Sequence, residues 1–218
     1  MTQLGLIRAT ALAGALALST LPAFAVADFV LKRDLDTTGN VTCSSETAFG
    51  NFVADAVKKA QGSDLAVVSC AIIRGNRLYT KGQSFDGTAA SAEIAADANS
   101  VVIEATGMQL LDAMEQALGT APAVSPTFPQ ISGVRLVFDA AKPAGQRVIK
   151  LTVNGAALDF QKTYRIAATE DLVKALAPFA ATKRVEGQPK PVAADVAALL
   201  QEVGVRDIKV LGRIKAGK

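Results

Sequence analysis

The stretch SSETAFGNFVADAVKKAQGSDLAVVSC, residues 44–70, joins a helical pattern to a buried strand with almost no turn between them. Apolar residues recur at helical spacing along its first part, and Gly62 suits a left-handed helix end. Ser44 or Ser45 is expected to cap the start of this helix. The apolar run LAVVS predicts a strand that returns along the helix, which is a pairing typical of domains that mix helices and sheet.

The first 25 residues have the pattern of a secretion signal. Arg8 precedes the apolar run ATALAGALALSTL, and Ala23-Phe24-Ala25 is a small-x-small cleavage pattern, with a second one at Ala25-Val26-Ala27. The apolar run is too short to span a membrane, and no cysteine follows it to accept a lipid. We therefore expect a periplasmic or secreted protein that has no membrane partner once the signal has been removed.

The two cysteines, Cys43 and Cys70, are expected to lie close together. At about 1.5 Å per helical residue and about 3.3 Å per strand residue, the helix and the strand have similar lengths, so the strand ends near the start of the helix. An even number of cysteines in an exported protein favours a disulfide, which would stabilise the fold by roughly 3–4 kcal/mol. Two unpaired, buried thiols are the alternative.

The composition excludes several classes of function. The 218 residues suit one domain or two small ones that share a core. The 23 basic and 20 acidic residues give a net charge of +3 and are scattered, and Trp is absent, so no nucleic-acid partner is expected. Histidine is also absent, which removes Ser-His-Asp catalysis and the usual zinc ligands. No phosphate-loop or calcium-loop motif is present, so we expect no metal, no cofactor and no catalysis by this chain alone.

Strand and helix patterns alternate through the rest of the chain. Asn154-Gly155 between two apolar runs indicates a hairpin, which excludes a purely parallel sheet, and Thr106 with Gln109 forms a capping-box pattern. The prediction is an α+β domain with a mixed sheet and interleaved helices. Strands are expected at residues 100–105, 133–139, 147–153, 164–169 and 207–214, helices at residues 106–119, 170–179 and 192–203, and an exposed linker at residues 183–191.

Several segments, in the same order, resemble the C-terminal domain of the bacterial 5′-nucleotidase family, which includes UDP-sugar hydrolases. They are ETAFGNFVADAVKKAQGSDLAVVS, IEATGMQLLDAMEQAL, PQISGVRLVFDAAKPAGQRVIKLTVNGAALDFQKTYRIAAT and the final LGRI. The resemblance covers most of residues 46–214. It divides the chain into a signal peptide (1–25), an N-terminal lead-in (26–45), a 5′-nucleotidase C-terminal-like domain (46–214) and a tail (215–218).

The resemblance implies that hydrolysis and substrate binding belong to different domains. In that family an N-terminal metallophosphoesterase domain holds two metals and hydrolyses the phosphoester. The C-terminal domain contributes the substrate pocket, with arginines for the phosphate and an aromatic clamp for the base. Here only a short lead-in precedes the C-terminal-like segment, so we expect the domain to stand alone.

The resemblance also suggests site residues. Arg74 matches the arginine of the family's N-G-G-G-I-R segment, in which Ser69, Cys70 and Ala71 replace the asparagine and glycines. The alternative for Arg74 is an ordinary surface arginine in a degenerate loop. The three replacements add Cβ atoms where a ligand would approach the backbone.

Three further residues are weaker candidates for the same site. Asn99 falls near the family's P-F-[GE]-N segment, although a turn-capping role would also explain it. Arg77 could assist Arg74 or simply be solvated, and the solvated state is favoured. EDLVKALAPF stands where the family has a G-G-D-G-[YF] loop, which leaves Phe179 as the candidate for the second aromatic of the clamp.

Three functions follow from these patterns. The first is a non-catalytic exported protein that binds a nucleotide or another phosphorylated small molecule. The second is an accessory subunit that completes a separate metallophosphoesterase protein in nucleotide hydrolysis. The third is an interaction module with a degenerate pocket, for which Arg74 would be paired with a local carboxylate.

Overall fold

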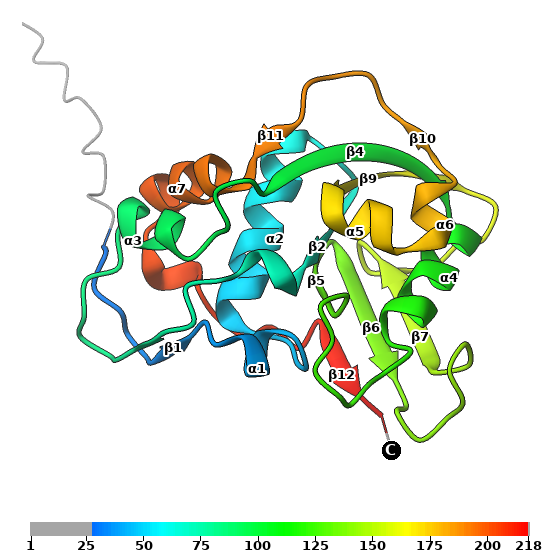
Figure 1. Ribbon diagram of the computed structural model, residues 1–218, viewed down its shortest axis with the longest axis horizontal. Helices are drawn as coiled ribbons and strands as arrows, with labels where there is room; N and C mark the ends of the chain where they lie inside the picture. The colour runs from blue at the N-terminus through cyan, green and yellow to red at the C-terminus, as the bar shows by residue number, and fades with distance from the viewer. Residues whose placement is uncertain (1–27, 218) are drawn as a thin grey trace, which may run out of the picture.

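The computed structural model describes residues 28–217, and its centre is a six-stranded mixed sheet in the order β10-β4-β9-β2-β5, with β11 also paired to β4 (Figure 1). β2 and β9 are parallel, with Val67 opposite Ala168, whereas the other pairs in this sheet are antiparallel. The strands are β2 (Leu65–Ser69), β4 (Asn99–Thr106), β5 (Pro129–Ser132), β9 (Thr163–Thr169), β10 (Lys183–Arg184) and β11 (Lys190–Pro191).

A second, four-stranded sheet has the order β12-β6-β7-β8. Its strands are β6 (Val134–Phe138), β7 (Val148–Val153), β8 (Ala156–Ala157) and β12 (Ile214–Ala216). Asn154 and Gly155 join β7 to β8 with φ angles of 49° and 84°. Two successive positive φ angles are typical of a type I′ hairpin turn, so the predicted turn is confirmed. The strand that returns is β8, whereas the expected strand over residues 164–169 lies in β9 of the central sheet.

The remaining elements are mainly helical. They are α1 (Gly39–Thr42), α2 (Ala48–Gln61), α3 (Gly87–Ala92), α4 (Gly107–Ala117), α5 (Glu170–Ala175), α6 (Ala177–Ala180) and α7 (Val192–Val203), the 3-10 helices η1 (Cys70–Ile72) and η2 (Val205–Asp207), and a small sheet of β1 (Leu35–Asp36) with β3 (Leu78–Tyr79).

Helix α2 ends as predicted but begins later than expected. Gly62 follows it with a φ of 58°, the left-handed conformation that ends helices. The N-cap is Thr47, whose hydroxyl accepts a hydrogen bond from the Gly50 amide at 3.0 Å. The prediction of Ser44 or Ser45 was wrong, because both hydroxyls donate back to carbonyls of α1 instead.

Two other helix predictions are confirmed with one change. The Thr106–Gln109 capping box is present at the start of α4. The helix predicted over residues 170–179 forms, but it is divided into α5 and α6 at Leu176, which has an extended backbone two residues before Pro178. The residue preceding a proline is disfavoured in helical conformation, and proline removes a helical donor, so a break in this region is expected physically.

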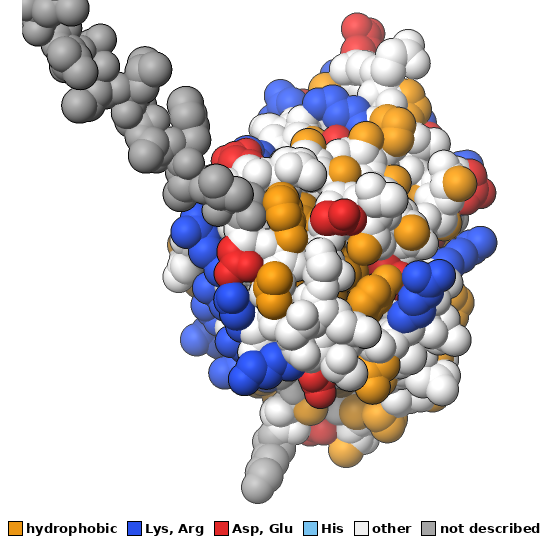
Figure 2. Space-filling model, turned by 90° about the vertical axis from the view of Figure 1, so that its left-hand side faces the viewer, with side chains coloured by type: hydrophobic (Ala, Val, Ile, Leu, Met, Phe, Trp, Pro, Cys, Tyr) orange, Lys and Arg blue, Asp and Glu red, His pale blue; other side chains and the backbone are white. Residues whose placement is uncertain are grey.

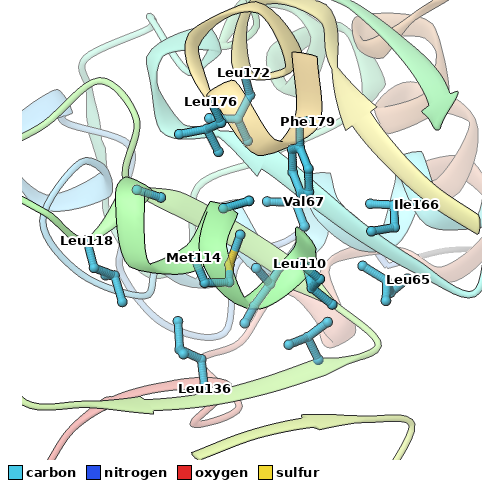
Figure 3. Close-up of a cluster of buried hydrophobic side chains, with 14 of the residues drawn as sticks. Leu65, Val67, Leu110, Met114, Leu118, Leu136, Ile166, Leu172, Leu176 and Phe179 are labelled. Atoms are coloured by element: carbon cyan, nitrogen blue, oxygen red, sulfur yellow. The ribbon is translucent and has the colours of Figure 1, made fainter. Parts of the chain in front are cut away.

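The central sheet is buried on both faces because each face carries its own apolar cluster. Leu65 and Val67 of β2 point into a cluster with α4, α5, α6 and the second sheet, part of which Figure 3 shows. Ala66 and Val68 point into the cluster formed with α2, α3 and α7. Side chains alternate across a strand, so an all-apolar strand such as β2 requires a covered surface on both sides.

Cys43 and Cys70 form a disulfide, with a Cα–Cα distance of 5.2 Å. Both cysteines are buried, and Cys70 directly follows β2, whose end lies near the start of α2. The predicted bridge is therefore confirmed, and the alternative of two unpaired thiols was wrong.

Two segments differ from their expected secondary structure, and the expected lead-in packs into the core. Residues 183–191 were expected as a linker, but they contain β10 and β11, which both pair antiparallel with β4. The last strand is β12 rather than residues 207–214, so it extends into the expected tail. The expected lead-in contributes β1 and α1, and its Leu31 and Leu35 are buried in the core. The expected signal peptide lies outside the described residues, and no described helix is long and apolar enough to cross a membrane.

Candidate functional site

The loop that follows β2 carries Arg74 and is fixed at its base. The Ser69 hydroxyl caps η1 by accepting from the Ala71 amide at 3.1 Å and donates to the Pro126 carbonyl at 3.0 Å. Cys70 is tied to Cys43 by the disulfide. Ser69 and Cys70 are therefore buried, and their side chains stabilise the protein interior. These are two of the residues that differ from the N-G-G-G-I-R segment of the resembling family.

The buried residue Glu93 holds the tip of this loop by hydrogen bonds. Its carbonyl accepts the amides of Arg74 at 2.7 Å and Gly75 at 3.3 Å. Its fully buried carboxylate accepts the hydroxyls of Thr37 and Tyr79, each at 2.6 Å. Burial and the bond to Glu93 raise the pKa of the Tyr79 hydroxyl above its ordinary value, although nearby Arg77 opposes this shift.

Gly75 is required by this packing. A Cβ built on Gly75 would lie 1.7 Å from Oε2 of Glu93, so no other residue fits there without movement of the loop or the carboxylate. The Glu93 carbonyl therefore holds the backbone amides of both Arg74 and Gly75, while the Arg74 side chain is exposed.

The strand directions of the central sheet bring the candidate residues together. β2 and β9 are parallel, so the Arg74 loop after β2 and helix α5 after β9 emerge at the same edge. β4 is antiparallel to β9, so its first residue, Asn99, starts at that edge as well. Ligands in sheets of this kind bind outside strand ends, where successive loops diverge.

These three segments surround a hollow of about 230 Å³, which we call the Arg74 hollow. Its basic side chains are Arg74 and Lys174, and its carboxylates belong to Asp97, Glu170 and Asp171. Lys174, Glu170 and Asp171 were not candidates from the sequence, because the helix over residues 170–179 was expected only as a replacement for a lost loop. Asp97 was not a candidate either.

Although three carboxylates line the Arg74 hollow, its two basic side chains are not paired with them. Arg74 donates from Nε to the Ala71 carbonyl at 3.0 Å, and among the described residues neither Arg74 nor Lys174 forms an ion pair. Glu170, by contrast, is paired with Arg184 at 3.1 Å. The guanidinium therefore retains free donors that face an open space.

A smaller hollow of about 200 Å³ adjoins the first and shares Glu170 and Lys174 with it. Its apolar lining residues include Val173, Ala180 and Phe179. The two hollows together present a polar end near Arg74 and an apolar end beside α6.

Of the weaker candidates Asn99 and Arg77, only Asn99 lines the Arg74 hollow. Asn99 lines the Arg74 hollow, but its side-chain amide donates to the Asp97 carbonyl at 3.2 Å, as a turn cap does. Arg77 is exposed and lies 3.9 Å from Glu93, and it is not among the residues that line the hollow.

Phe179 is buried and does not line the Arg74 hollow, but it is among the residues that line the smaller hollow. Its ring points from α6 toward Val67 within the buried cluster (Figure 3). A role for Phe179 in an aromatic clamp stays a prediction.

Within residues 28–217 no group of three or more His, Cys, Asp or Glu side chains could hold a metal ion. The carboxylates that line the Arg74 hollow are available as hydrogen-bond acceptors.

Comparison with family models gives one match, to the model described as "5′-nucleotidase, C-terminal domain", over residues 29–183. Among curated proteins, the trifunctional nucleotide phosphoesterase protein YfkN of Bacillus subtilis (strain 168) is 30% identical over 134 residues. That alignment covers 57% of this chain and 9% of the Bacillus protein.

Solved structures share the fold. The 5′-nucleotidase precursor of Thermus thermophilus superposes with a TM-score of 0.71 at 24% identity, covering 87% of this chain and 39% of that one. The NAD nucleotidase of Haemophilus influenzae gives 0.69 at 13% identity, covering 90% and 39%. This chain therefore spans less than half the length of either nucleotidase.

Proposed function

This chain belongs to the family of 5′-nucleotidase C-terminal domains, and on that premise we propose that it is an exported, non-catalytic protein that binds a nucleotide or another phosphorylated small molecule in the Arg74 hollow. The observation that carries the proposal is Arg74 itself. Its backbone is fixed by Glu93, and its guanidinium faces the hollow without a carboxylate partner among the described residues.

The chemistry of the hollow favours a nucleotide over a bare anion. Arg74 and Lys174 would bind phosphate oxygens, for which guanidinium and ammonium donors are well suited. Asp97 and Asp171 would accept hydrogen bonds from sugar hydroxyls or amino groups. The smaller hollow beside Val173 would take the apolar part of the ligand, against a lining that includes aliphatic side chains and Phe179.

Export and lack of catalysis are parts of the same proposal. The buried Cys43–Cys70 disulfide supports an oxidising compartment, in which such bridges persist. The absence of histidine supports a binding role, because the chain lacks the usual proton-transfer residue and the usual nitrogen ligand of metals.

The test is a thermal-shift titration of the mature, oxidised protein without metal against nucleotides, nucleoside phosphates, UDP-sugars and inorganic phosphate. A ligand that binds the native state raises the melting temperature. We expect the largest rise with a nucleotide, and its loss in Arg74→Ala. Arg33→Ala is the matched control, because Arg33 is an exposed arginine outside the hollow. No rise with any nucleotide, or an equal loss in both variants, would rule the proposal out.

A second function is favoured by the lengths of the relatives. Because the chain aligns with only 39% of the Thermus nucleotidase, it could complete a separate metallophosphoesterase protein in nucleotide hydrolysis. On the face shown in Figure 2, hydrophobic side chains are scattered among polar ones, so that face does not itself suggest a docking surface. The test mixes the protein with an isolated metallophosphoesterase domain of this family and divalent metal. Unchanged hydrolysis of AMP and UDP-glucose would contradict this function.

The third function, a degenerate interaction module, has less support. It requires Arg74 to be paired with a local carboxylate, and no such pair is present among the described residues.

A further inference from the structure

The outer face of the second sheet carries a group of basic side chains that the proposed function does not use. Leu136, Leu151 and Ile214 lie opposite one another on β6, β7 and β12, and all three are buried in the core. Because side chains alternate along a strand, the next row must point outward. That row consists of Lys215, Val137 and Lys150.

Arg135 extends the same outward face by one more position. It lies opposite Thr152 in the register of β6 and β7, two residues from Val137. Its Nη1 donates to the carbonyls of Leu211 at 3.3 Å and Gly212 at 3.2 Å, which holds the guanidinium over the sheet. Arg135, Lys150, Lys215 and Thr152 line an open depression of about 360 Å³, which we call the basic trough.

The basic trough differs from the Arg74 hollow in its charge. No acidic side chain is among its lining residues, whereas three carboxylates line the Arg74 hollow. None of Arg135, Lys150 and Lys215 forms an ion pair with a described residue. Lys215 and Lys150 are separated by one strand, so they are roughly 10 Å apart at their Cα atoms, which is close enough for mutual repulsion across a surface.

A neighbouring depression of about 210 Å³ continues the trough toward the hairpin turn. It shares Arg135 and Gly155 with the trough and adds Asn154 and Arg213, again without an acidic lining residue. Arg213 is paired with Asp55, so Arg135 is the unpaired cation that this depression shares with the trough.

We propose that the basic trough is a second binding site, for a soluble anion that carries several phosphate groups. A multivalent anion can contact Arg135, Lys150 and Lys215 at once and relieve their repulsion. The Thr152 hydroxyl supplies a neutral donor beside Arg135. No aromatic residue lines the trough, so recognition follows the number of phosphates and is indifferent to a base. This site is separate from the Arg74 hollow and shares no lining residue with it.

The experiment is a calorimetric titration of the mature, oxidised protein with tripolyphosphate, pyrophosphate, ATP and adenosine at low ionic strength. We expect affinity to rise with the phosphate number, ATP to resemble tripolyphosphate, and adenosine not to bind. K150Q/K215Q should lower the affinity for tripolyphosphate about tenfold, as expected for the loss of two exposed charge contacts.

The matched control is K81Q/K183Q, which makes the same change in net charge at two exposed lysines outside the trough. It should bind tripolyphosphate like the wild type. An equal loss in the two double variants would overturn the proposal in favour of general attraction to a basic protein. A loss in Arg74→Ala but not in K150Q/K215Q would overturn it in favour of the Arg74 hollow.

A vesicle arm separates a soluble anion from a lipid surface. Vesicles of phosphatidylglycerol and of phosphatidylcholine are sedimented with the wild type and with K150Q/K215Q. Binding of phosphatidylglycerol vesicles without any binding of tripolyphosphate would overturn the proposal, because the trough would then recognise a membrane surface. Tripolyphosphate binding that is weakened by K150Q/K215Q and not by K81Q/K183Q would support it, whether or not the nucleotide test of the Arg74 hollow succeeds.

Discussion

The guanidinium of Arg213 donates from Nη2 to Oδ2 of Asp55 at 2.8 Å, and this contact joins the last strand segment to helix α2 across 158 residues of sequence. Arg213 also donates to the carbonyls of Ile131 at 2.7 Å and Asn51 at 3.2 Å. Its side chain is only 11% exposed. The Asp55 carboxylate accepts the Ser132 hydroxyl as well, so the pair ties α2, β5 and the C-terminal segment together.

Arg213→Ala should therefore destabilise the protein by about 2–4 kcal/mol, because it leaves a partly buried carboxylate and two carbonyls without their donor. The measurement is urea unfolding followed by circular dichroism. Arg33→Ala, at an exposed arginine, should change the unfolding free energy by no more than about 0.5 kcal/mol. Equal effects of the two substitutions would show that the contact contributes nothing specific.

Glu46 makes a parallel connection to the same C-terminal segment. It accepts the amides of Leu211 at 2.9 Å and Ile214 at 3.1 Å, and the Asn51 side-chain amide at 2.6 Å. Burial by itself would raise the pKa of Glu46, but these hydrogen bonds outweigh burial and lower the pKa below its ordinary value of 4.5. Its contribution to stability is present above pH 4.5 and is lost as the pH falls through the lower folded pKa. Glu46→Gln should therefore lose stability at neutral pH and show a weaker acid-induced loss than the wild type in urea unfolding.

Loss of the Cys43–Cys70 bridge should lower the unfolding free energy by about 3 kcal/mol, since it closes a loop of intermediate length. The comparison is urea unfolding of the wild type with and without dithiothreitol. Dithiothreitol should have no further effect on a C43S/C70S variant. A wild type that is insensitive to the reductant under unfolding conditions would contradict the prediction.

Gly75→Ala should loosen the Arg74 loop, because the added Cβ would collide with the buried Glu93 carboxylate. We expect a loss of about 1–3 kcal/mol, as in other overpacked sites, together with a weaker ligand-induced thermal shift. Gly39→Ala is the control, because a Cβ there meets no atom within 4 Å. A Gly75→Ala variant that matched Gly39→Ala would show that the loop yields without cost.

Asp195 should make stability fall as the pH rises. Burial raises its pKa from 3.8 to about 6, against a smaller opposing effect of Lys190, and its Oδ2 accepts no hydrogen bond from the described residues. The folded state therefore binds a proton that the unfolded state has already released. The stability gained with the proton is present below pH 3.8 and is lost as the pH rises through about 6.

Asp195→Asn should accordingly stabilise the protein at neutral pH, by on the order of 1 kcal/mol after allowance for solvent screening. It should also flatten the dependence of the unfolding free energy on pH between about 4 and about 7, the range that brackets the two pKa values. The control is Asp112→Asn, at an exposed position of α4. If the Asp195→Asn profile had the same slope as the wild type, the buried carboxylate would not be its source.

The sequence alone determined most of the local structure, because local structure depends on residues close in the chain. The left-handed Gly62, the Thr106–Gln109 capping box and the Asn154-Gly155 turn each specify a conformation within a few residues, and all three are present. The Cys43–Cys70 bridge could be predicted for a similar reason, since one helix–strand pair brings the two cysteines together. The family resemblance could be recognised from the order of the sequence segments.

The tertiary structure decided what depends on strand order and on side-chain direction. Only the parallel pairing of β2 with β9 brings Arg74 and Lys174 to one hollow, and only the bend at Leu176 turns Phe179 into the core. The basic trough likewise exists because β12 pairs with β6 and places Lys215 in register with Lys150. Residues that are far apart in the chain become neighbours through burial of apolar surface and pairing of strands. Which residues pair in two distant strands cannot be read from either strand's own sequence, because the register depends on both strands and on the face that is buried.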